Sequence, residues 1–222
     1  MSVSALPQWR SVLAVVAHPD DESFGLGAVL SSFIDAGGRV AVLCLTHGEA
    51  STLHGVEGDL TGIRAAELRA AADTLGVAEV ELMDFPDGGL ASMPLEELAA
   101  AVGMVATRHQ VEGLLGFDLS GVTGHPDHAA ATRAAVAVGE RLGLPVLGWT
   151  LPMAVAQQLN EEFGAGFVGH TDAEIDARVT VSRERQLNAA ACHPSQAVPG
   201  SVLWRRLELL GDLEYLRVLR SG

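Results

Sequence analysis

Lysine is absent from this chain of 222 residues, and all 14 of its basic side chains are arginines. They are outnumbered by 28 acidic residues, which leaves a formal net charge of −14 at pH 7. A protein with this charge repels phosphate backbones and anionic lipid, so we expect no nucleic-acid and no membrane partner. An apolar run of the ~18 residues that a membrane span needs is also missing.

Cysteine is scarce, and the two residues present, Cys44 and Cys192, lie far apart in the sequence. Cys44 sits inside an apolar run, where a reduced thiol packs as a small hydrophobic side chain. The first seven residues have neither the basic nor the apolar segment of a secretion signal. Nothing therefore requires a disulfide, and we expect a reducing, cytoplasmic location.

Charged residues make up 19% of the chain and hydrophobic residues 48%, a balance that predicts a folded chain with a sizeable core. Strand-like and helix-like segments alternate along its first 150 residues. Such alternation predicts an α/β fold, with a mostly parallel sheet and helices on both faces. The strands are expected at 12–17, 40–45, 79–83, 111–117 and 145–149, and the helices at 22–36, 63–75, 94–109 and 126–142.

The pattern weakens after Trp149. We expect an irregular segment at 157–170, a strand near 175–181, helices at 183–192 and 204–210, and a last edge strand at 214–219. No linker or internal repeat is visible, so the chain is expected to form a single domain over 1–222. Its core would span about 10–150 and a small C-terminal extension about 151–222.

The densest group of ionisable residues is the stretch from His18 to Glu22, which follows the first predicted strand. Burying such groups is costly unless something binds them. Other polar groups follow later strands, at 46–49, 84–87 and 118–128. The carboxyl ends of parallel strands meet at one edge of a sheet, so these groups are expected to converge there.

A second motif, at 124–128, repeats the His-Pro-Asp pattern of the first. His18 and Asp21 are spaced i, i+3, as are His125 and His128, and this spacing can direct two side chains to one point. Catalytic zinc sites use three protein ligands, here predicted as His18, Asp21 and His128. The same donors suit ferrous iron. Asp20 is then the candidate general base, and His125 is left to protonate a leaving amine or to stabilise an oxyanion.

Together the two motifs resemble the PIG-L/LmbE-like family of zinc-dependent N-deacetylases. Further matches are Thr46-x-Gly48-Glu49, Arg64-x-x-Glu67, Asp87-Gly88 and His193-x-Ser195-Gln196, in the family's order over about residues 12 to 196. The resemblance implies a Rossmann-like fold. It also implies hydrolysis of an N-acetyl group, typically on an N-acetylglucosamine moiety of a small-molecule substrate.

The resemblance assigns roles residue by residue. It implies the three metal ligands named above, Asp20 as general base and His125 in the acid or oxyanion role. The positions implied to contact substrate are Glu49, Arg64, Asp87 and His193. One position departs from the family, because Thr123 stands where some members have a tyrosine, so another group covers the oxyanion or the substrate differs.

Several alternatives remain open from the sequence. The same site could cleave a larger amide, such as a thiol S-conjugate. A nucleotide-binding dehydrogenase is disfavoured, because the acids from Asp20 to Glu22 would repel a pyrophosphate at that helix start. A non-catalytic metal-binding module is disfavoured because Asp20 and His125 are both present. Glu22 is expected to belong to the helix, and Asp127 to a turn or to the surroundings of the metal.

Overall fold

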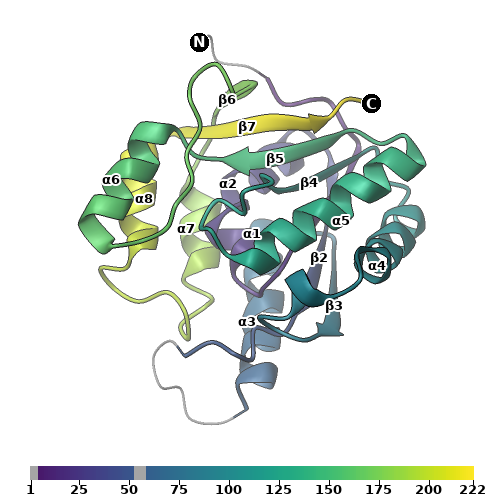
Figure 1. The fold of residues 1–222 in the computed structure, drawn as a ribbon, viewed down its shortest axis with the longest axis horizontal. Coiled ribbons are helices and arrows are strands. Elements are labelled where there is room, and N and C mark those ends of the chain that lie inside the picture. Colours follow the sequence, from purple (N-terminus) through teal and green to yellow (C-terminus); the bar gives the residue numbers. More distant parts are fainter. Residues whose placement is uncertain (1–4, 53–58) are drawn as a thin grey trace.

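The computed structural model describes residues 5–52 and 59–222. They form a seven-stranded sheet in the order β3-β2-β1-β4-β5-β7-β6. Strands β1 to β5 are parallel, whereas β7 runs antiparallel to both β5 and β6. The strands are β1 (Ser11–Val16), β2 (Arg39–Thr46), β3 (Glu79–Phe85), β4 (Gly113–Phe117), β5 (Val146–Thr150), β6 (Ala177–Thr180) and β7 (Leu213–Arg220). The expected α/β fold with a mostly parallel sheet is confirmed (Figure 1).

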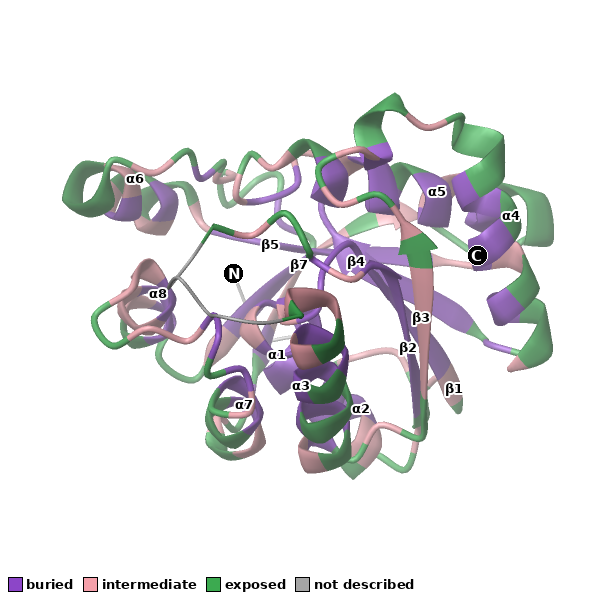
Figure 2. Cartoon of the chain, turned by 90° about the horizontal axis from the view of Figure 1, so that it is seen from below, coloured by how far each residue is buried: buried purple, intermediate pink, exposed green. Residues whose placement is uncertain are grey.

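Helices cover both faces of the sheet. Figure 2 shows α4 and α5 on one side of it, and α2, α3 and α7 on the other. The helices are α1 (Asp21–Phe24), α2 (Gly27–Asp35), α3 (Leu60–Leu75), α4 (Leu95–Arg108), α5 (Pro126–Leu142), α6 (Met153–Phe163), α7 (Glu184–Ala190) and α8 (Val202–Leu210), with a short 3-10 turn, η2 (Leu90–Ser92). Among the helices of the described residues, none is long and apolar enough to cross a membrane.

The central strand β1 shows why both faces are covered. Val12 and Ala14 pack into the core on the side of α2 and α3, whereas Leu13 and Val15 pack into the core under α4 and α5. Successive side chains of a strand point to opposite faces, so an unbroken apolar run needs a hydrophobic layer on each. The charged residues that follow β1 therefore lie at the edge of a rigid sheet.

The structure corrects three expectations. The helix expected at 22–36 is two helices, α1 and α2, separated at Gly25 and Leu26. The segment 157–170, expected to be irregular, contains most of α6. Strand β7 is not an edge strand, because it lies between β5 and β6. Two strands of the predicted C-terminal extension thus belong to the same sheet as the core.

Candidate metal centre and active site

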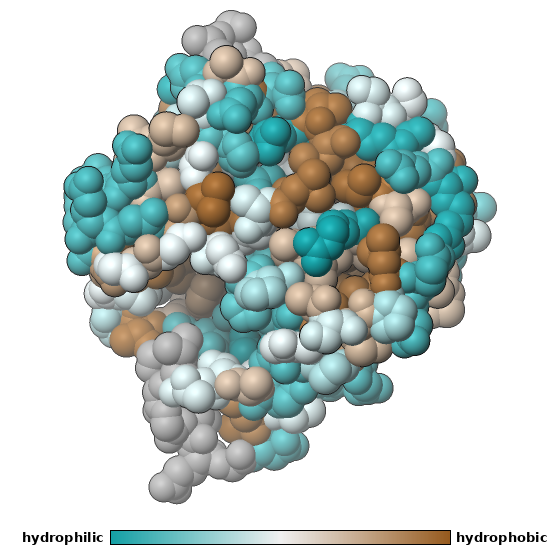
Figure 3. Space-filling model, in the orientation of Figure 1, coloured by the Kyte–Doolittle hydropathy of each residue, from teal (hydrophilic) through white to brown (hydrophobic). Residues whose placement is uncertain are grey.

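The polar groups predicted to converge lie around a cavity of about 380 Å³ beyond the carboxyl ends of β1 and β4. It is lined by residues from both His-Pro-Asp motifs, from the loop after β2 and from α3 and α8. The face drawn in Figure 3 is hollowed near α8 of Figure 1. His54, which belongs to neither motif, lies outside the described residues.

The turn between β1 and α1 folds around the carboxylate of Asp21. The backbone N–H groups of Ala17 and His18 both donate to Asp21 Oδ2, at 3.1 and 3.0 Å. His18 and Asp21 are nearly fully buried, at 8% and 6% exposure. The i, i+3 spacing therefore does place both side chains at one point, as the sequence predicted.

His128 brings the second motif to the same point, because it begins α5 beside the end of β4. Its Nε2 lies 3.1 Å from Asp21 Oδ1 and 3.2 Å from His18 Nδ1. Its other ring nitrogen, Nδ1, faces the carbonyl oxygen of Gly121 at 3.1 Å and the Thr123 hydroxyl at 3.0 Å. A carbonyl can only accept, so Nδ1 carries the proton and Nε2 presents a lone pair to the site.

The ring of His18 lies between two carboxylates on one side and the predicted metal site on the other. Its Nε2 lies 3.0 Å from Asp87 Oδ1 and 3.6 Å from Asp127 Oδ2 without making a hydrogen bond, and the charge of these two carboxylates favours a proton on Nε2, which leaves Nδ1 facing inward. When both rings are neutral, two lone pairs and the Asp21 carboxylate therefore meet with no donor between them. Acceptors converge in this way around a cation, and carboxylates behind a ligating histidine are the usual support of such a site. The residues present therefore fit a metal ion.

The pKa values of these three side chains are also shifted in the direction expected of a cation-binding site. Burial alone would lower the pKa of His18, but Asp127, Asp87 and Asp21 raise it to about 10. Burial would likewise lower the pKa of His128, yet the charge of Asp21 raises it. Burial raises the pKa of Asp21, and the two histidines lower it far below its usual range. The site thus favours positive charge.

Two groups in the described residues bring potential ligand atoms within 4.8 Å of one another. One consists of His18, His125 and His128, and the other of His18, Asp87 and Asp127. Both contain His18, whose two ring nitrogens face opposite ways. The structure therefore supports a His/Asp metal site at the predicted place, with the identity of the full ligand set left to the proposal below.

Asp20 sits beside this cluster in a conformation rare for a residue with a side chain. Its φ is 127° and its ψ is −28°. Its N–H donates to Glu22 Oε2 at 2.9 Å, and Arg64 donates to its Oδ2 at 3.0 Å. Such backbone strain costs about 1–3 kcal/mol and persists where surrounding contacts enforce it, often at functional sites. Burial raises the pKa of Asp20 to about 6, against the opposing charge of Arg64.

Arg64 is a buried arginine of α3. It is 3% exposed, and it donates to the carbonyl oxygens of Gly48, at 2.7 Å, and Pro19. These bonds join α3, the loop after β2 and the first motif. Arg64 therefore holds Asp20 in place as well as lining the cavity.

Glu22 and His193 form a fully buried pair behind the first motif. His193 Nε2 lies 2.7 Å from Glu22 Oε1, and both side chains are 0% exposed. His193 is not among the cavity-lining residues described, so it reaches Asp20 through Glu22 and not the substrate space directly. Glu22, expected to serve the helix, instead links His193 to the backbone of Asp20.

The remaining predicted residues divide between the cavity and its surroundings. His125 and Asp87 line the cavity, whereas Glu49 is exposed and accepts a hydrogen bond from the Asp87 N–H at 3.0 Å. His125 caps α5, with its Nδ1 accepting from the Asp127 N–H at 3.2 Å. Burial, together with the charges of His18 and His128, lowers the pKa of His125.

Sequence reasoning missed part of the cavity wall. Phe24, Phe117, Phe167 and Leu203 make much of it apolar, and Arg206 lies among them. The aromatic residues carry no motif, and Arg206 stands in a helical pattern that looks like an ordinary amphipathic surface. Only their positions at the ends of α1 and β4, in the loop after α6 and on α8 bring them to the site.

The chain is similar in sequence to known proteins over most of its length. Residues 13–138 match the PIG-L family, described as GlcNAc-PI de-N-acetylase. A 1D-myo-inositol 2-acetamido-2-deoxy-alpha-D-glucopyranoside deacetylase of Nakamurella multipartita is 29% identical, over 95% of this chain and 89% of its own. A protein of the same name from a Mycobacterium species is 30% identical, over 81% and 71%.

Solved structures share the fold. Teicoplanin deacetylase Orf2, in a zinc-inhibited form, superposes with a TM-score of 0.74 at 21% identity, over 96% of this chain and 99% of its own. N,N'-diacetylchitobiose deacetylase from Pyrococcus horikoshii gives 0.68 at 21% identity, over 95% and 84%. From its sequence match over more than half its length, the chain belongs to the PIG-L family of N-deacetylase hydrolases.

Proposed function

We propose that this protein is a zinc-dependent N-deacetylase that removes the acetyl group from an N-acetylglucosamine-type conjugate. The observation that carries the proposal is the convergence of two histidine lone pairs and one carboxylate beside a strained, arginine-bound Asp20. Relatives named for deacetylation of an acetamido-glucopyranoside support the substrate class.

His18, Asp21 and His128 would hold the metal, through Nδ1, a carboxylate oxygen and Nε2. Zinc bound to these side chains would polarise the amide carbonyl and acidify an attacking water. Two imidazoles and a carboxylate also suit ferrous iron, so both metals belong in the test.

Asp20 is the proposed general base. It takes a proton from the attacking water as the oxygen bonds to the amide carbon, and its pKa of about 6 leaves it mostly ionised at pH 7. His125, partly exposed at the cavity edge, delivers a proton to the leaving nitrogen as the C–N bond breaks. The products are acetate and a free amine.

The sugar would occupy the polar part of the cavity. Arg64, Asp87, Ser51 and Gln196 line it together, and the Ser51 hydroxyl donates to Gln196 Oε1 at 3.0 Å. Donors and acceptors of this kind suit sugar hydroxyls. Glu49 and His193 would act indirectly. Glu49 would support Asp87, and His193 would support Glu22.

The second candidate, cleavage of a larger amide in the same site, is favoured by one observation. Aromatic and aliphatic side chains of Phe24, Phe167, Val202 and Leu203 line the cavity, and an acetyl group alone would not fill this apolar part. The reaction would be unchanged and only the acyl or amine portion would be larger.

The test is release of acetate from N-acetylglucosamine and its inositol conjugate by protein stripped of metal and then given zinc or ferrous iron. We expect no release without metal and turnover with one of the two. A protein that binds neither metal and hydrolyses neither compound would overturn the proposal.

A further inference from the structure

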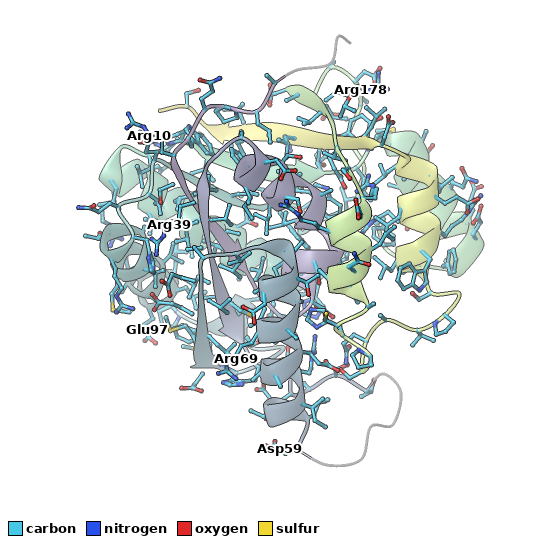
Figure 4. All side chains as sticks on the ribbon, turned by 180° about the vertical axis from the view of Figure 1, so that it is seen from behind. Arg10, Arg39, Asp59, Arg69, Glu97 and Arg178 are labelled. Atoms are coloured by element: carbon cyan, nitrogen blue, oxygen red, sulfur yellow. The ribbon has the colours of Figure 1, made fainter. Side chains whose placement is uncertain are left out.

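Arg206 is a buried arginine that forms no ion pair with any acid in the described part of the chain. It lines the active-site cavity from α8 and is 5% exposed. Its Nη2 donates to the carbonyl oxygen of Phe24, and its guanidinium lies over the Trp149 ring, 4.9 Å from the centroid. Arginines such as Arg10 and Arg69 instead reach the periphery of the molecule (Figure 4).

The acid whose charge acts most on Arg206 already has other partners. Glu214 is paired with Arg183 and accepts from Trp149 Nε1 at 2.6 Å. Among the described residues, none accepts a hydrogen bond from Arg206 Nε. Burial lowers the pKa of Arg206 to about 10, so it remains charged at neutral pH. A buried charge without a direct ion pair is costly, and a bound anion would lower that cost.

A second feature also favours an anion here. Ser201 and Val202, at the N-terminus of α8, line the same cavity. Helix N-termini carry a partial positive charge from backbone N–H groups that have no partner within the helix. Apolar side chains line the same cavity, among them Phe24, Phe117 and Leu203.

Ring contacts join the two ends of the cavity. The Phe117 ring lies 4.7 Å from the ring of His128 and 5.0 Å from that of Trp149, and Trp149 carries Arg206 on its face. Arg206 is therefore separated from the metal site by an aromatic wall, which consists of the rings of Phe117 and Trp149. A ligand that spans both places needs a short apolar arm between the amide and its anionic end.

We propose that Arg206 binds a carboxylate carried by the substrate, at the end of a short apolar arm. A single guanidinium in an apolar wall suits a monoanionic carboxylate, which it can bind through two parallel hydrogen bonds. The inference rests on the proposed function, because it places the amide at the metal site. The acid can belong to the acyl group or to the group attached to the sugar, and the test separates these sources.

The test is calorimetric titration of the metal-free, full-length protein with two matched pairs of ligands. N-succinyl-glucosamine is compared with N-butanoyl-glucosamine, and the 3-carboxypropyl glycoside of N-acetylglucosamine with its butyl glycoside. We expect the acid of one pair to bind about 10- to 100-fold more tightly than its neutral counterpart. That pair identifies which side of the substrate carries the carboxylate.

Arg206→Gln should abolish this preference, and Arg205→Gln is the matched control. Arg205 is the adjacent arginine of α8, but its guanidinium pairs with Glu162 and Glu208 at the surface. Where Arg206→Gln fails to fold, the Nε–H resonance of Arg206 in the wild-type protein, assigned with Arg206→Lys, should shift with the acid and not with its neutral counterpart.

Equal binding within both pairs, or a preference that survives in Arg206→Gln, would overturn the inference, as would tighter binding of inorganic phosphate than of either acid. The proposed function is judged separately, on the zinc-loaded protein. Acid binding without any amide hydrolysis would reject the function and leave the carboxylate site. Acetate release without a preference for the acid would support the proposed function and reject the carboxylate site.

Discussion

The two histidines of the centre are oriented by what stands behind them. His128 Nδ1 faces a backbone carbonyl and His18 Nε2 faces two carboxylates, so each ring turns a lone pair toward Asp21. Asp20, one residue away from Asp21, is held out of this set by Arg64 and by its own backbone conformation. Asp20 and Asp21 are adjacent in sequence, but their different surroundings suit them to different roles.

Asp20→Asn tests that division of roles. The amide keeps the shape of the side chain but cannot take a proton, so we expect kcat to fall about 10²- to 10⁴-fold with the bound metal retained. Acetate release and metal content are measured on the same samples. Asp84→Asn is the control, since Asp84 is an exposed acid paired with His47. A variant at Asp20 with near wild-type turnover would show that another group is the base.

At the scale of elements, the break between α1 and α2 makes room for the aromatic wall. A Cβ on Gly25 would lie 2.5 Å from Phe117 Cε1, far inside contact distance. The backbone of Gly25 itself is in the ordinary right-handed region, at φ −85°. Glycine is therefore required by the closeness of Phe117 and not by the turn.

Gly25→Ala should for this reason destabilise the protein. We expect the free energy of unfolding to fall by about 1–3 kcal/mol, as for an overpacked core. Gly103→Ala is the matched control. Its Cβ would meet Val138 at 3.7 Å, an ordinary contact, and alanine in the middle of α4 should stabilise by about 0.5–1 kcal/mol. Denaturant unfolding measures both, and equal effects would refute this explanation of the break.

Prediction from sequence succeeded where neighbouring residues carry the information. The motif from His18 to Asp21 is local, and its position after an apolar strand placed it at the correct sheet edge. The place of β7 between β5 and β6 depends on tertiary pairing, so its alternating pattern could not distinguish an edge strand from an inner one. The burial of Arg206 was equally hidden, because α8 acquires its inward face only by packing.

The difference between local sequence information and tertiary packing also explains why only some of the predicted substrate contacts line the cavity. Arg64 and Asp87 line the cavity, whereas His193 is buried behind it and Glu49 is exposed beside Asp87. All four occur in matching sequence motifs, and a motif does not reveal which layer a side chain occupies. Depth depends on how α3, α7 and the loops assemble, which single-sequence patterns do not determine.

At the scale of the whole molecule, the centre joins distant parts of the chain. The first motif lies at the start of α1, His128 lies on α5, and His193 follows α7. A metal that binds only the folded arrangement must stabilise all of these contacts together. Metal binding and global stability are therefore expected to be linked.

Metal removal should accordingly lower the thermal stability of the protein. At free zinc about 100 times its dissociation constant, we expect a gain of about 2.7 kcal/mol in unfolding free energy over the stripped protein. His128→Ala should lose this gain. His47→Ala should keep it, because His47 pairs with Asp84 and is not among the described residues that line the cavity. Thermal melts with and without chelator measure the difference. An unchanged zinc effect in His128→Ala would exclude His128 as a ligand.

The most direct measurement is anomalous diffraction at the zinc edge from crystals of the zinc-loaded protein. The proposal predicts one strong peak between His18 Nδ1, the Asp21 carboxylate and His128 Nε2, with the Asp20 carboxylate beside it and unbound. A peak on the other side of His18, between Nε2, Asp87 and Asp127, or no peak within the cavity, would contradict it.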